Sequence, residues 1–179
     1  MRVATIANTS FALGTICLAL SLLMIVQRYN PNRLSFERYF PAAAHVQTTP
    51  SSPVRLVIPS VGIDTPVEQI DHTNDWNIST SSIHHLSSSP APSEVGNSIM
   101  FGHNWPMLLG PLVNIKPGSQ IQVHSSSGKV SIFEVIATDV VDPHETEVLR
   151  QTDDFHLTLY TCVGFLDSKR FVVSAVLRS

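Results

Sequence analysis

A cysteine and an arginine flank one short segment near the C-terminal end of the sequence, and together they could form a thiolate nucleophile with a cationic neighbour. Cys162 ends the strand-like run 156–162, and Arg170 precedes the strand-like run 171–177. Because side chains alternate along a strand, both would point to the same, non-core side if the two runs pair as neighbours. A nearby cation lowers the pKa of a thiol, and the thiolate can attack a carbonyl carbon. An unpaired cysteine is often only a small buried hydrophobic residue, but the strand-end position, the non-core side and the nearby cation count against that interpretation for Cys162.

Nucleophilic cysteine chemistry also needs a base or an imidazolium, and the sequence contains eight histidines. His103 ends the run 97–103, so a strand would deliver it to the rim of a domain. His156 begins the run that carries Cys162 and fits a simple edge position. The others stand in polar, turn-like or spacer contexts, where a solvated histidine is expected: His45, His72, His84, His85, His124 and His144. Spacing alone therefore does not choose the partner of Cys162.

Short runs rich in β-branched and aromatic residues recur along the second part of the chain, with proline and glycine between them. The runs are 54–58, 98–101, 120–124, 130–141, 156–161 and 171–177. Helical periodicity is scarce, and only 106–115 and 145–150 favour a turn or two of helix. The pattern predicts a mainly β domain, a small closed barrel or sandwich, with short helices. Segment 79–93, with Ser, Pro and a His pair, is predicted to be a long surface loop.

The N-terminal segment has the composition of a membrane-spanning helix. No charged residue occurs between residues 3 and 26, and about 20 apolar helical residues cross a hydrocarbon core. A cleaved signal peptide is the alternative, but the small-residue triplet 42–44 lies far beyond the apolar run, whereas a cleavage site follows such a run closely. We therefore expect an uncleaved anchor over 1–28, a Pro/Ser/Thr-rich linker over 29–53 and one folded domain over 54–179.

Composition and charge exclude several classes of protein. The 179 residues carry a formal net charge of −3, divided into +3 on residues 1–53 and −6 on residues 54–179, which excludes a nucleic-acid binder held by a basic surface. Charged residues make up 14% of the chain, below the ~25% usual for soluble domains, as expected if part of it does not face water. Two cysteines cannot form a disulfide framework, and C-x-x-C, phosphate-loop, H-E-x-x-H and G-x-S-x-G motifs do not occur.

Four segments of the expected folded domain, in order, resemble the signatures of one family. Residues 157–162, Leu-Thr-Leu-Tyr-Thr-Cys, resemble the T-L-x-T-C signature of sortases, the membrane-anchored cysteine transpeptidases of bacterial surfaces. Residues 96–103 resemble the family's G-N-x…G-H segment, and Arg170-Phe-Val-Val resembles its R-x-V-V strand. Residues 55–59 with 62–68 are similar to the beginning of the sortase barrel. The resemblance covers almost the whole of the expected domain.

The resemblance implies a mainly β fold, a closed β-barrel of about eight strands with short helices, preceded by a transmembrane helix. It implies that Cys162 is the nucleophile, His103 the general acid and Arg170 the group that stabilises the oxyanion. Four neighbouring residues are candidates for the substrate groove: Asn104, Trp105, Tyr160 and Thr161. Asn104-Trp105-Pro106 after the histidine and Val163-Gly164 after the cysteine depart from common family patterns and leave the subclass open, classes D and E included.

The resemblance also implies partners and a location. The substrates would be surface proteins with an L-P-x-T-G-like sorting signal, and the acceptor an amine of a peptidoglycan precursor or a pilin lysine. The N-terminus would be cytoplasmic and the barrel extracytoplasmic, on a single-pass protein of the cell membrane. No nucleic acid and no cofactor is expected. Calcium candidates are the carboxylates of Glu145, Glu147, Asp153 and Asp154, for which a plain acidic surface is the favoured interpretation.

Three alternatives to this interpretation remain. An L,D-transpeptidase-like wall enzyme would carry its thiol in an S-x-G-C-x-R context, whereas Cys162 lies in Tyr-Thr-Cys-Val-Gly. A membrane-tethered β-barrel binding module without catalysis would contain Cys162 incidentally. A metal site built from His84, His85 and His103 is disfavoured, because adjacent residues on a strand point apart.

Overall fold

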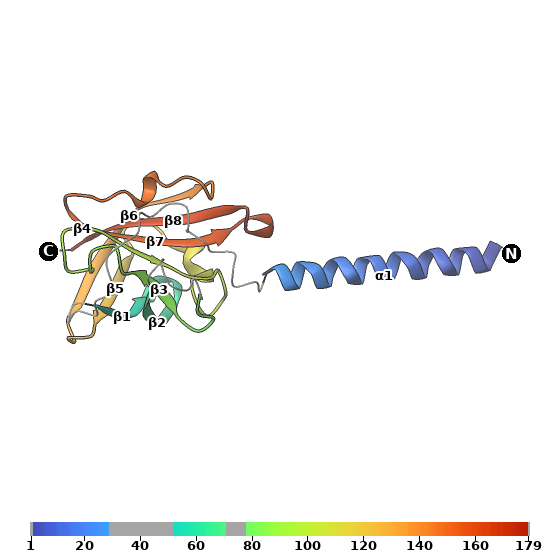
Figure 1. Ribbon diagram of the computed structural model, residues 1–179, viewed down its shortest axis with the longest axis horizontal. Helices are drawn as coiled ribbons and strands as arrows, with labels where there is room; N and C mark the ends of the chain where they lie inside the picture. The colour runs from blue at the N-terminus through green and yellow to red at the C-terminus, as the bar shows by residue number, and fades with distance from the viewer. Residues whose placement is uncertain (1, 29–51, 71–77, 179) are drawn as a thin grey trace. The chain divides into compact units, whose positions relative to one another are not determined.

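The computed structural model describes residues 2–28, 52–70 and 78–178 (Figure 1). The chain divides into two compact units, residues 1–30 and residues 31–179, each of which is described by itself. The expected linker 29–53 falls outside the described residues except for its last two positions.

The first unit is one helix, α1 (Arg2–Arg28). Its segment Ser10–Gln27 has a mean hydropathy of 2.0, and none of this 18-residue window is buried. At 1.5 Å per residue the helix is about 40 Å long, which exceeds the ~30 Å hydrocarbon core of a bilayer. The hydroxyls of Thr15 and Ser21 donate to carbonyl oxygens of the preceding turn, so these polar groups are satisfied within the helix. By length and composition, α1 is either a signal sequence or a membrane anchor.

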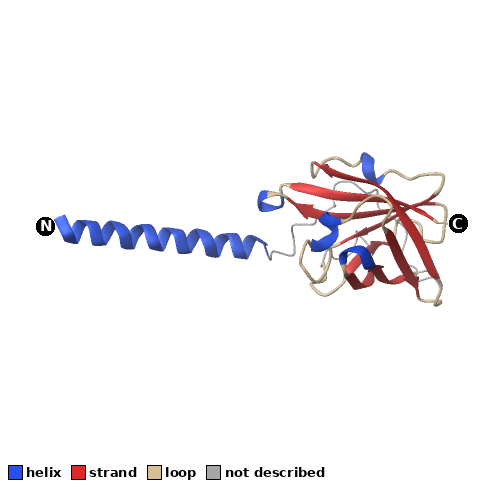
Figure 2. Cartoon of the chain, turned by 180° about the vertical axis from the view of Figure 1, so that it is seen from behind, coloured by secondary structure: helices blue, strands red, loops and turns tan. Residues whose placement is uncertain are grey.

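The second unit is mainly β, and its described strands form a closed barrel of eight, as the sequence predicted (Figures 1 and 2). The strands are β1 (Pro53–Ile58), β2 (Ile63–Ile70), β3 (Ile83–Leu86), β4 (Gly96–Phe101), β5 (Gln120–Ser125), β6 (Val130–Val141), β7 (Phe155–Val163) and β8 (Lys169–Leu177). Around the barrel the order is β1-β2-β3-β4-β7-β8-β6-β5. The pairs β2–β3 and β4–β7 are parallel, and the other pairs are antiparallel.

Short 3₁₀ helices lie in the connections between the strands (blue in Figure 2). They are η2 (Pro59–Val61), η3 (Gly110–Asn114), η4 (Glu147–Leu149) and η5 (Phe165–Asp167). Two of them, η3 and η4, fall inside the segments in which the sequence favoured a helical turn. The element η5 connects β7 to β8, and it therefore lies beside the strand ends that carry Cys162 and Arg170.

Side-chain alternation divides the apolar residues of the barrel between two clusters. The larger cluster fills the interior and draws buried residues from all eight described strands, among them Leu157 and Leu159 of β7. The smaller cluster, on the outer side of the wall, contains Ile70, Ile78, Leu86, Ile99, Phe101, Leu149, Tyr160, Cys162 and Val172. The predicted core face of β7 is therefore confirmed, with Cys162 on the other side. The sequence did not indicate that this outer side is itself buried.

The predicted surface loop 79–93 is wrong in its middle, because β3 forms there and all four of its residues are buried. β3 pairs with β2 on one side and β4 on the other, so it is part of the barrel wall. The sequence Ile-His-His-Leu does not indicate a buried strand, since two adjacent histidines interrupt the alternation of apolar and polar residues that predicts one. His84 and His85 are 2% and 3% exposed, which corrects the expectation that they are solvated.

Polar groups of three neighbouring segments lie within hydrogen-bond distance of the ring nitrogens of the buried His85. Its Nδ1 lies 2.8 Å from Gln69 Oε1 on β2. Its Nε2 lies 3.1 Å from Ser98 Oγ on β4 and 3.1 Å from the carbonyl oxygen of Pro90. Burial lowers the pKa of His85 from 6.5 to about 4. The imidazole is therefore neutral at neutral pH and carries one N–H. With the proton on Nδ1 it donates to Gln69 on β2 and accepts from the Ser98 hydroxyl on β4, and with the proton on Nε2 it can donate to the Pro90 carbonyl.

Acidification is expected to destabilise the barrel through His85. The unfolded chain protonates this histidine near pH 6.5, whereas the folded chain resists protonation until about pH 4. The stabilisation is therefore complete above pH 6.5 and is lost as the pH falls toward 4, by about 3 kcal/mol in total. Urea unfolding between pH 7.5 and pH 4.5 measures this loss. A His85→Gln variant should lose less stability over the same range, and an equal loss in both proteins would contradict the assignment.

Candidate active site

The structure brings the cysteine, the histidine and the arginine singled out in the sequence to one end of adjacent strands. β7 and β8 are antiparallel neighbours, and Cys162 is paired in register with Arg170. β4 runs parallel to β7, and the register that pairs Phe101 with Tyr160 carries His103, two residues later, to the level of Cys162. Across the sheet the order is therefore His103, Cys162, Arg170.

The turn from β4 into His103 is fixed by Gly102 and Thr161. The Gly102 N–H donates to the Tyr160 carbonyl at 3.4 Å, and Thr161 Oγ1 donates to the Gly102 carbonyl at 2.8 Å. A Cβ on Gly102 would lie 2.8 Å from Ile83 Cγ2, so glycine allows this close approach to β3. Thr161, a predicted groove residue, is fully buried on the opposite face of β7 from Cys162. In this structure it supports the turn that carries His103.

Cys162 lies on the outer face of β7, where it is only 3% exposed. It belongs to the outer apolar cluster together with Phe101 and with Tyr160, a predicted groove residue that is 2% exposed. Sequence reasoning placed the thiol on the correct face but expected a more open position. The strand register places two ionisable residues beside Cys162, His103 on the β4 side and Arg170 on the β8 side. The surroundings of the thiol are therefore not exclusively apolar.

His103 is 5% exposed, and its ring stacks on Trp105 with the ring centroids 4.4 Å apart and the ring planes 9° apart. Its Nε2 has no hydrogen-bond partner among the residues that the structure describes. Burial lowers the pKa of His103, and the Asp167 carboxylate opposes this effect. The imidazole is therefore mainly neutral at neutral pH, and its Nε2 can take up or release a proton.

A tight turn keeps Trp105 against His103. The amides of Leu108 and Gly110 donate to the Trp105 carbonyl at 2.9 Å, and the Leu109 amide donates to the His103 carbonyl at 3.1 Å. A Cβ on Gly110 would lie 2.7 Å from the Trp105 carbonyl oxygen, so the turn requires glycine. Trp105 also packs against the interior cluster, which fixes the ring on which the imidazole stacks.

Arg170 is half-buried at the start of β8, and the loop before it anchors its guanidinium. Nη1 donates to the carbonyl oxygens of Asp167, at 2.7 Å, and of Lys169, at 3.0 Å. Asp167 Oδ1 also accepts a hydrogen bond from Asn104 Nδ2 at 3.1 Å. The predicted groove residue Asn104 is thus bonded to the β7–β8 loop, beside Arg170.

A second buried histidine, His84, lies near this row, although the sequence favoured a solvated position for it and disfavoured its only proposed link to His103, a shared metal site. The ring of His84 on β3 is 5.8 Å from the ring of Phe101, and its Nε2 accepts a hydrogen bond from the Ser79 N–H at 2.8 Å. Burial lowers the pKa of His84, while Glu68 raises it and His103 lowers it. His84 and His103 therefore interact electrostatically. A buried strand with two adjacent histidines carries no periodic signal that could have revealed this.

Among the residues that the structure describes, no group of three or more His, Cys, Asp or Glu side chains could hold a metal ion. Two of the calcium candidates interact with basic side chains. Glu147 pairs with Arg150 at 2.6 Å, and Asp154 Oδ1 lies 3.7 Å from His156 Nδ1.

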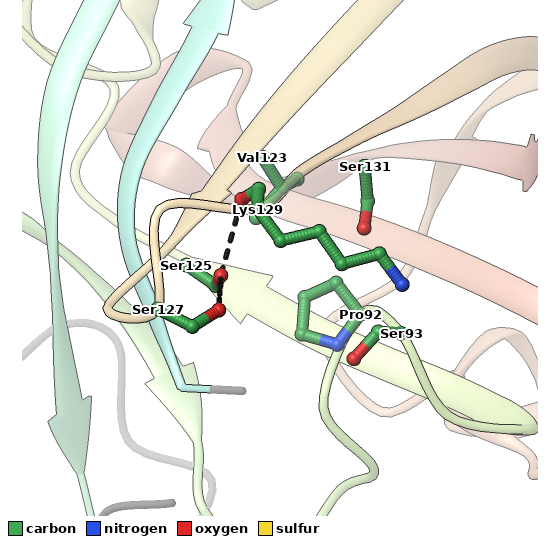
Figure 3. Close-up of a pocket in the computed structure, with 7 residues that line it drawn as sticks. All are labelled: Pro92, Ser93, Val123, Ser125, Ser127, Lys129 and Ser131. Carbon is green, nitrogen blue, oxygen red and sulfur yellow. Dashed lines mark hydrogen bonds between the residues drawn. The ribbon is translucent and has the colours of Figure 1, made fainter. Parts of the chain in front are cut away.

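A small pocket at the other end of the barrel is separate from this row (Figure 3). It is lined by Pro92, Ser93, Val123, Ser125, Ser127, Lys129 and Ser131. The β5–β6 turn that forms it lies at the beginning of β6, whereas Val141 at the end of β6 pairs with Arg170. Ser125 Oγ is bonded to Ser127 Oγ and to the Lys129 carbonyl, so the turn satisfies its own hydroxyls (dashed in Figure 3).

Comparisons with known proteins show the family and the fold to which the barrel is similar. The family model described as "Sortase domain" matches residues 56–178. The Bacillus subtilis (strain 168) protein named "Putative sortase YwpE" is 34% identical over 70 residues, which are 37% of this chain and 68% of that protein.

Solved sortase structures are similar to the barrel. Sortase A from Corynebacterium diphtheriae has a TM-score of 0.64 and 24% identity over 72% of this chain, and the match spans 61% of that protein, less than two thirds of it. Sortase C1 from Streptococcus agalactiae has a TM-score of 0.64 and 20% identity over 89% of this chain and 90% of that one. Listeria monocytogenes sortase A has a TM-score of 0.58 and 25% identity over 72% of this chain and 88% of that one. At 24% and 20% identity, the similarities to the Corynebacterium diphtheriae and Streptococcus agalactiae structures establish a shared fold.

Proposed function

This chain belongs to the sortase family of cysteine transpeptidases, and we propose that Cys162, His103 and Arg170 carry out its reaction on a sorting signal of the L-P-x-T-G type. One observation supports this assignment above all. The three side chains come from β7, from the second residue after the last β4–β7 pair and from β8, and the register places them in one row across the sheet. A nucleophile with a proton donor on one side and a cation on the other suits acyl transfer.

In the proposed first half-reaction, the Cys162 thiolate attacks the carbonyl carbon of the Thr-Gly bond and forms an Sγ–C bond. The carbonyl oxygen becomes an oxyanion, which the guanidinium of Arg170 stabilises together with a backbone N–H. As the C–N bond breaks, the His103 imidazolium gives its proton to the departing glycine amine. The products are a thioester on Cys162, a free amine and a neutral imidazole.

In the second half-reaction, a primary amine attacks the thioester carbonyl. Neutral His103 accepts a proton from this amine, the new amide bond forms, and Cys162 leaves as a thiolate. The acceptor is an amine of a peptidoglycan precursor or a pilin lysine. The thiolate and the imidazolium are both restored, so the cycle balances without a further reactant.

The productive state holds Cys162 as a thiolate and His103 as an imidazolium at the same time. Burial lowers the pKa of His103, so this state is a minor fraction of the enzyme whenever the thiol has the higher pKa of the two. The low exposure of Cys162 adds a second requirement, because a peptide carbonyl reaches the sulfur only after neighbouring side chains move. Both features predict slow turnover.

We further propose that α1 is an uncleaved anchor, with its N-terminus in the cytoplasm and the barrel outside the cell membrane. The length and hydropathy of α1 support this placement. Sorting substrates and lipid-linked acceptors reside at the membrane, so a tether raises their effective concentration. The intact mass of the protein purified from membranes tests the proposal, since cleavage would remove the helix.

A panel of quenched sorting-signal peptides tests the proposed reaction. The full-length chain in detergent micelles is incubated with each peptide, with and without triglycine as the amine. We expect cleavage between threonine and glycine, and a ligated product only when triglycine is present. Correctly folded protein that cleaves none of the peptides would count against the proposal.

Alkylation of Cys162 is expected to depend on His103. In a Cys17→Ser background Cys162 is the only cysteine, so iodoacetamide labelling followed by mass spectrometry reports on it alone. The His103→Ala variant removes the imidazole that can take up the thiol proton, so the thiolate–imidazolium pair cannot form, and labelling should slow about tenfold. His124→Ala on β5 is the control, and its labelling rate should equal that of the parent. Indifference to His103→Ala would favour the non-catalytic binding module that the sequence left open.

A further inference from the structure

We propose that Asp167 is a positioning residue for this reaction, which fixes the loop after His103 through its side chain and the guanidinium of Arg170 through its carbonyl oxygen. Its carboxylate also supplies the negative charge that faces the imidazole. The inference rests on the proposed function, because it concerns the same reaction, and it adds a residue of the β7–β8 loop to the groups that determine the rate.

Asp167 is hydrogen-bonded to both segments that flank the end of β7. Its Oδ1 accepts a hydrogen bond at 3.1 Å from Nδ2 of Asn104, the residue that follows His103. Its carbonyl oxygen accepts a hydrogen bond at 2.7 Å from Arg170 Nη1. One residue therefore joins the segment that carries the imidazole to the side chain that carries the guanidinium, and both bonds depend on its conformation.

The backbone at Asp167 has an uncommon conformation, which sets the directions of its carboxylate and of its carbonyl oxygen. Leu166 and Asp167 have φ angles of 52° and 57°, in the left-handed region that residues other than glycine seldom adopt. Aspartate tolerates this region better than leucine does. The turn is closed by the Asp167 N–H, which donates to the Gly164 carbonyl at 3.2 Å, and by the Ser168 N–H, which donates to the Phe165 carbonyl at 3.2 Å. Strain of this kind concentrates at functional sites, where surrounding contacts maintain it.

The ionisable groups that face His103 come from four elements. His84 on β3 and Asp167 in the β7–β8 loop interact electrostatically with His103, and Glu68 on β2 acts on His84. The strand register places Cys162 on β7, and beyond it Arg170 on β8, in the same row. Asp167 is the carboxylate of this set that acts on His103, and it raises the pKa of the imidazole against the effect of burial. It therefore favours the imidazolium that the first half-reaction uses.

The Asp167→Asn variant separates the charge from the geometry. Asparagine tolerates the left-handed backbone, its Oδ1 can accept the Asn104 N–H, and the carbonyl that holds Arg170 is retained. Without the charge, the imidazolium fraction falls. The acidic limb of the kcat/KM profile is therefore expected to move to lower pH, and the plateau to fall about three- to tenfold. A purely structural role would leave the acidic limb in place.

Two further variants control this experiment in the full-length enzyme. Asp167→Gly keeps the left-handed backbone but removes the charge and the bond to Asn104, so kcat is expected to fall further than in Asp167→Asn. Asp142→Asn removes an exposed carboxylate that is bonded to Lys169 Nζ at 2.8 Å, and it is expected to leave the profile unchanged. An Asp167→Asn profile that matches the wild type would overturn the proposal.

An NMR titration of the His103 ring keeps this inference separate from the proposed reaction, because it needs no turnover. The pKa of the ring is expected to be lower in Asp167→Asn than in the wild type. A wild-type enzyme that cleaves no peptide but shows this difference contradicts the proposed reaction and supports the charge role of Asp167. Equal titration curves in the two proteins overturn the inference, whether or not peptides are cleaved.

Discussion

Replacement of Cys162 by alanine is expected to abolish cleavage of sorting-signal peptides, with a loss of about 10⁴-fold or more in kcat/KM. The reason is chemical, because the acyl group has no sulfur on which to form a thioester. Cys162→Ser should be nearly as poor, since a serine hydroxyl has a far higher pKa than a thiol and ionises too rarely beside a histidine that burial keeps mainly neutral. Initial rates with a quenched peptide measure both variants.

The same chain offers a matched control and a direct view of the intermediate. Cys17 lies on α1, and Cys17→Ser is expected to retain full activity. Mass spectrometry of Cys17→Ser mixed with a peptide should detect an acyl adduct on Cys162, which triglycine removes. Cys162→Ala leaves only a small cavity in the outer cluster, so its thermal unfolding midpoint should change little. A folded Cys162→Ala protein that still cleaves the peptide would refute the assignment of the nucleophile.

The pairing of Cys162 with Arg170 could be predicted because it depends on local information. A two-residue period fixes the face on which each side chain of a strand lies, and the short segment 163–169 favours pairing of the strands that it connects. The structure agrees, with the two residues in register. The mainly β architecture could also be predicted, since short strands separated by turn residues are typical of a barrel or a sandwich, and the family resemblance then selected the closed barrel.

The position of His103 and the burial of the thiol depend on long-range packing, which no local pattern encodes. β4 and β7 pair in parallel although a long stretch of chain separates them, so spacing left the partner histidine open and the family resemblance selected it. Ile78 and Leu149, from segments that connect the strands, complete the outer cluster around Cys162. Their packing against the barrel produces no periodic pattern of apolar residues in the sequence. The left-handed backbone conformation at Asp167 could not be predicted from the sequence either, because the surrounding structure imposes it.

Replacement of Arg170 by alanine is expected to lower kcat by about 10²-fold or more, with a smaller effect on KM. In the proposed mechanism the guanidinium places a positive charge where the oxyanion develops, so its contribution would be larger in the transition state than in the bound substrate. The loss corresponds to about 3 kcal/mol of transition-state stabilisation. Arg150→Ala is the matched control, because Arg150 is an exposed arginine paired with Glu147, and its removal should leave kcat unchanged.

Arg170→Lys distinguishes a requirement for charge from a requirement for geometry. Nη1 of Arg170 is bonded to the carbonyls of Asp167 and Lys169, and the planar guanidinium fixes the direction of its other nitrogens relative to that anchor. A lysine has one nitrogen, which cannot occupy the anchored position and a second donor position together, so the lysine variant should recover less than a tenth of the wild-type kcat. If lysine restored most of the activity, a positive charge alone would suffice, and the anchored geometry at the start of β8 would have no catalytic importance.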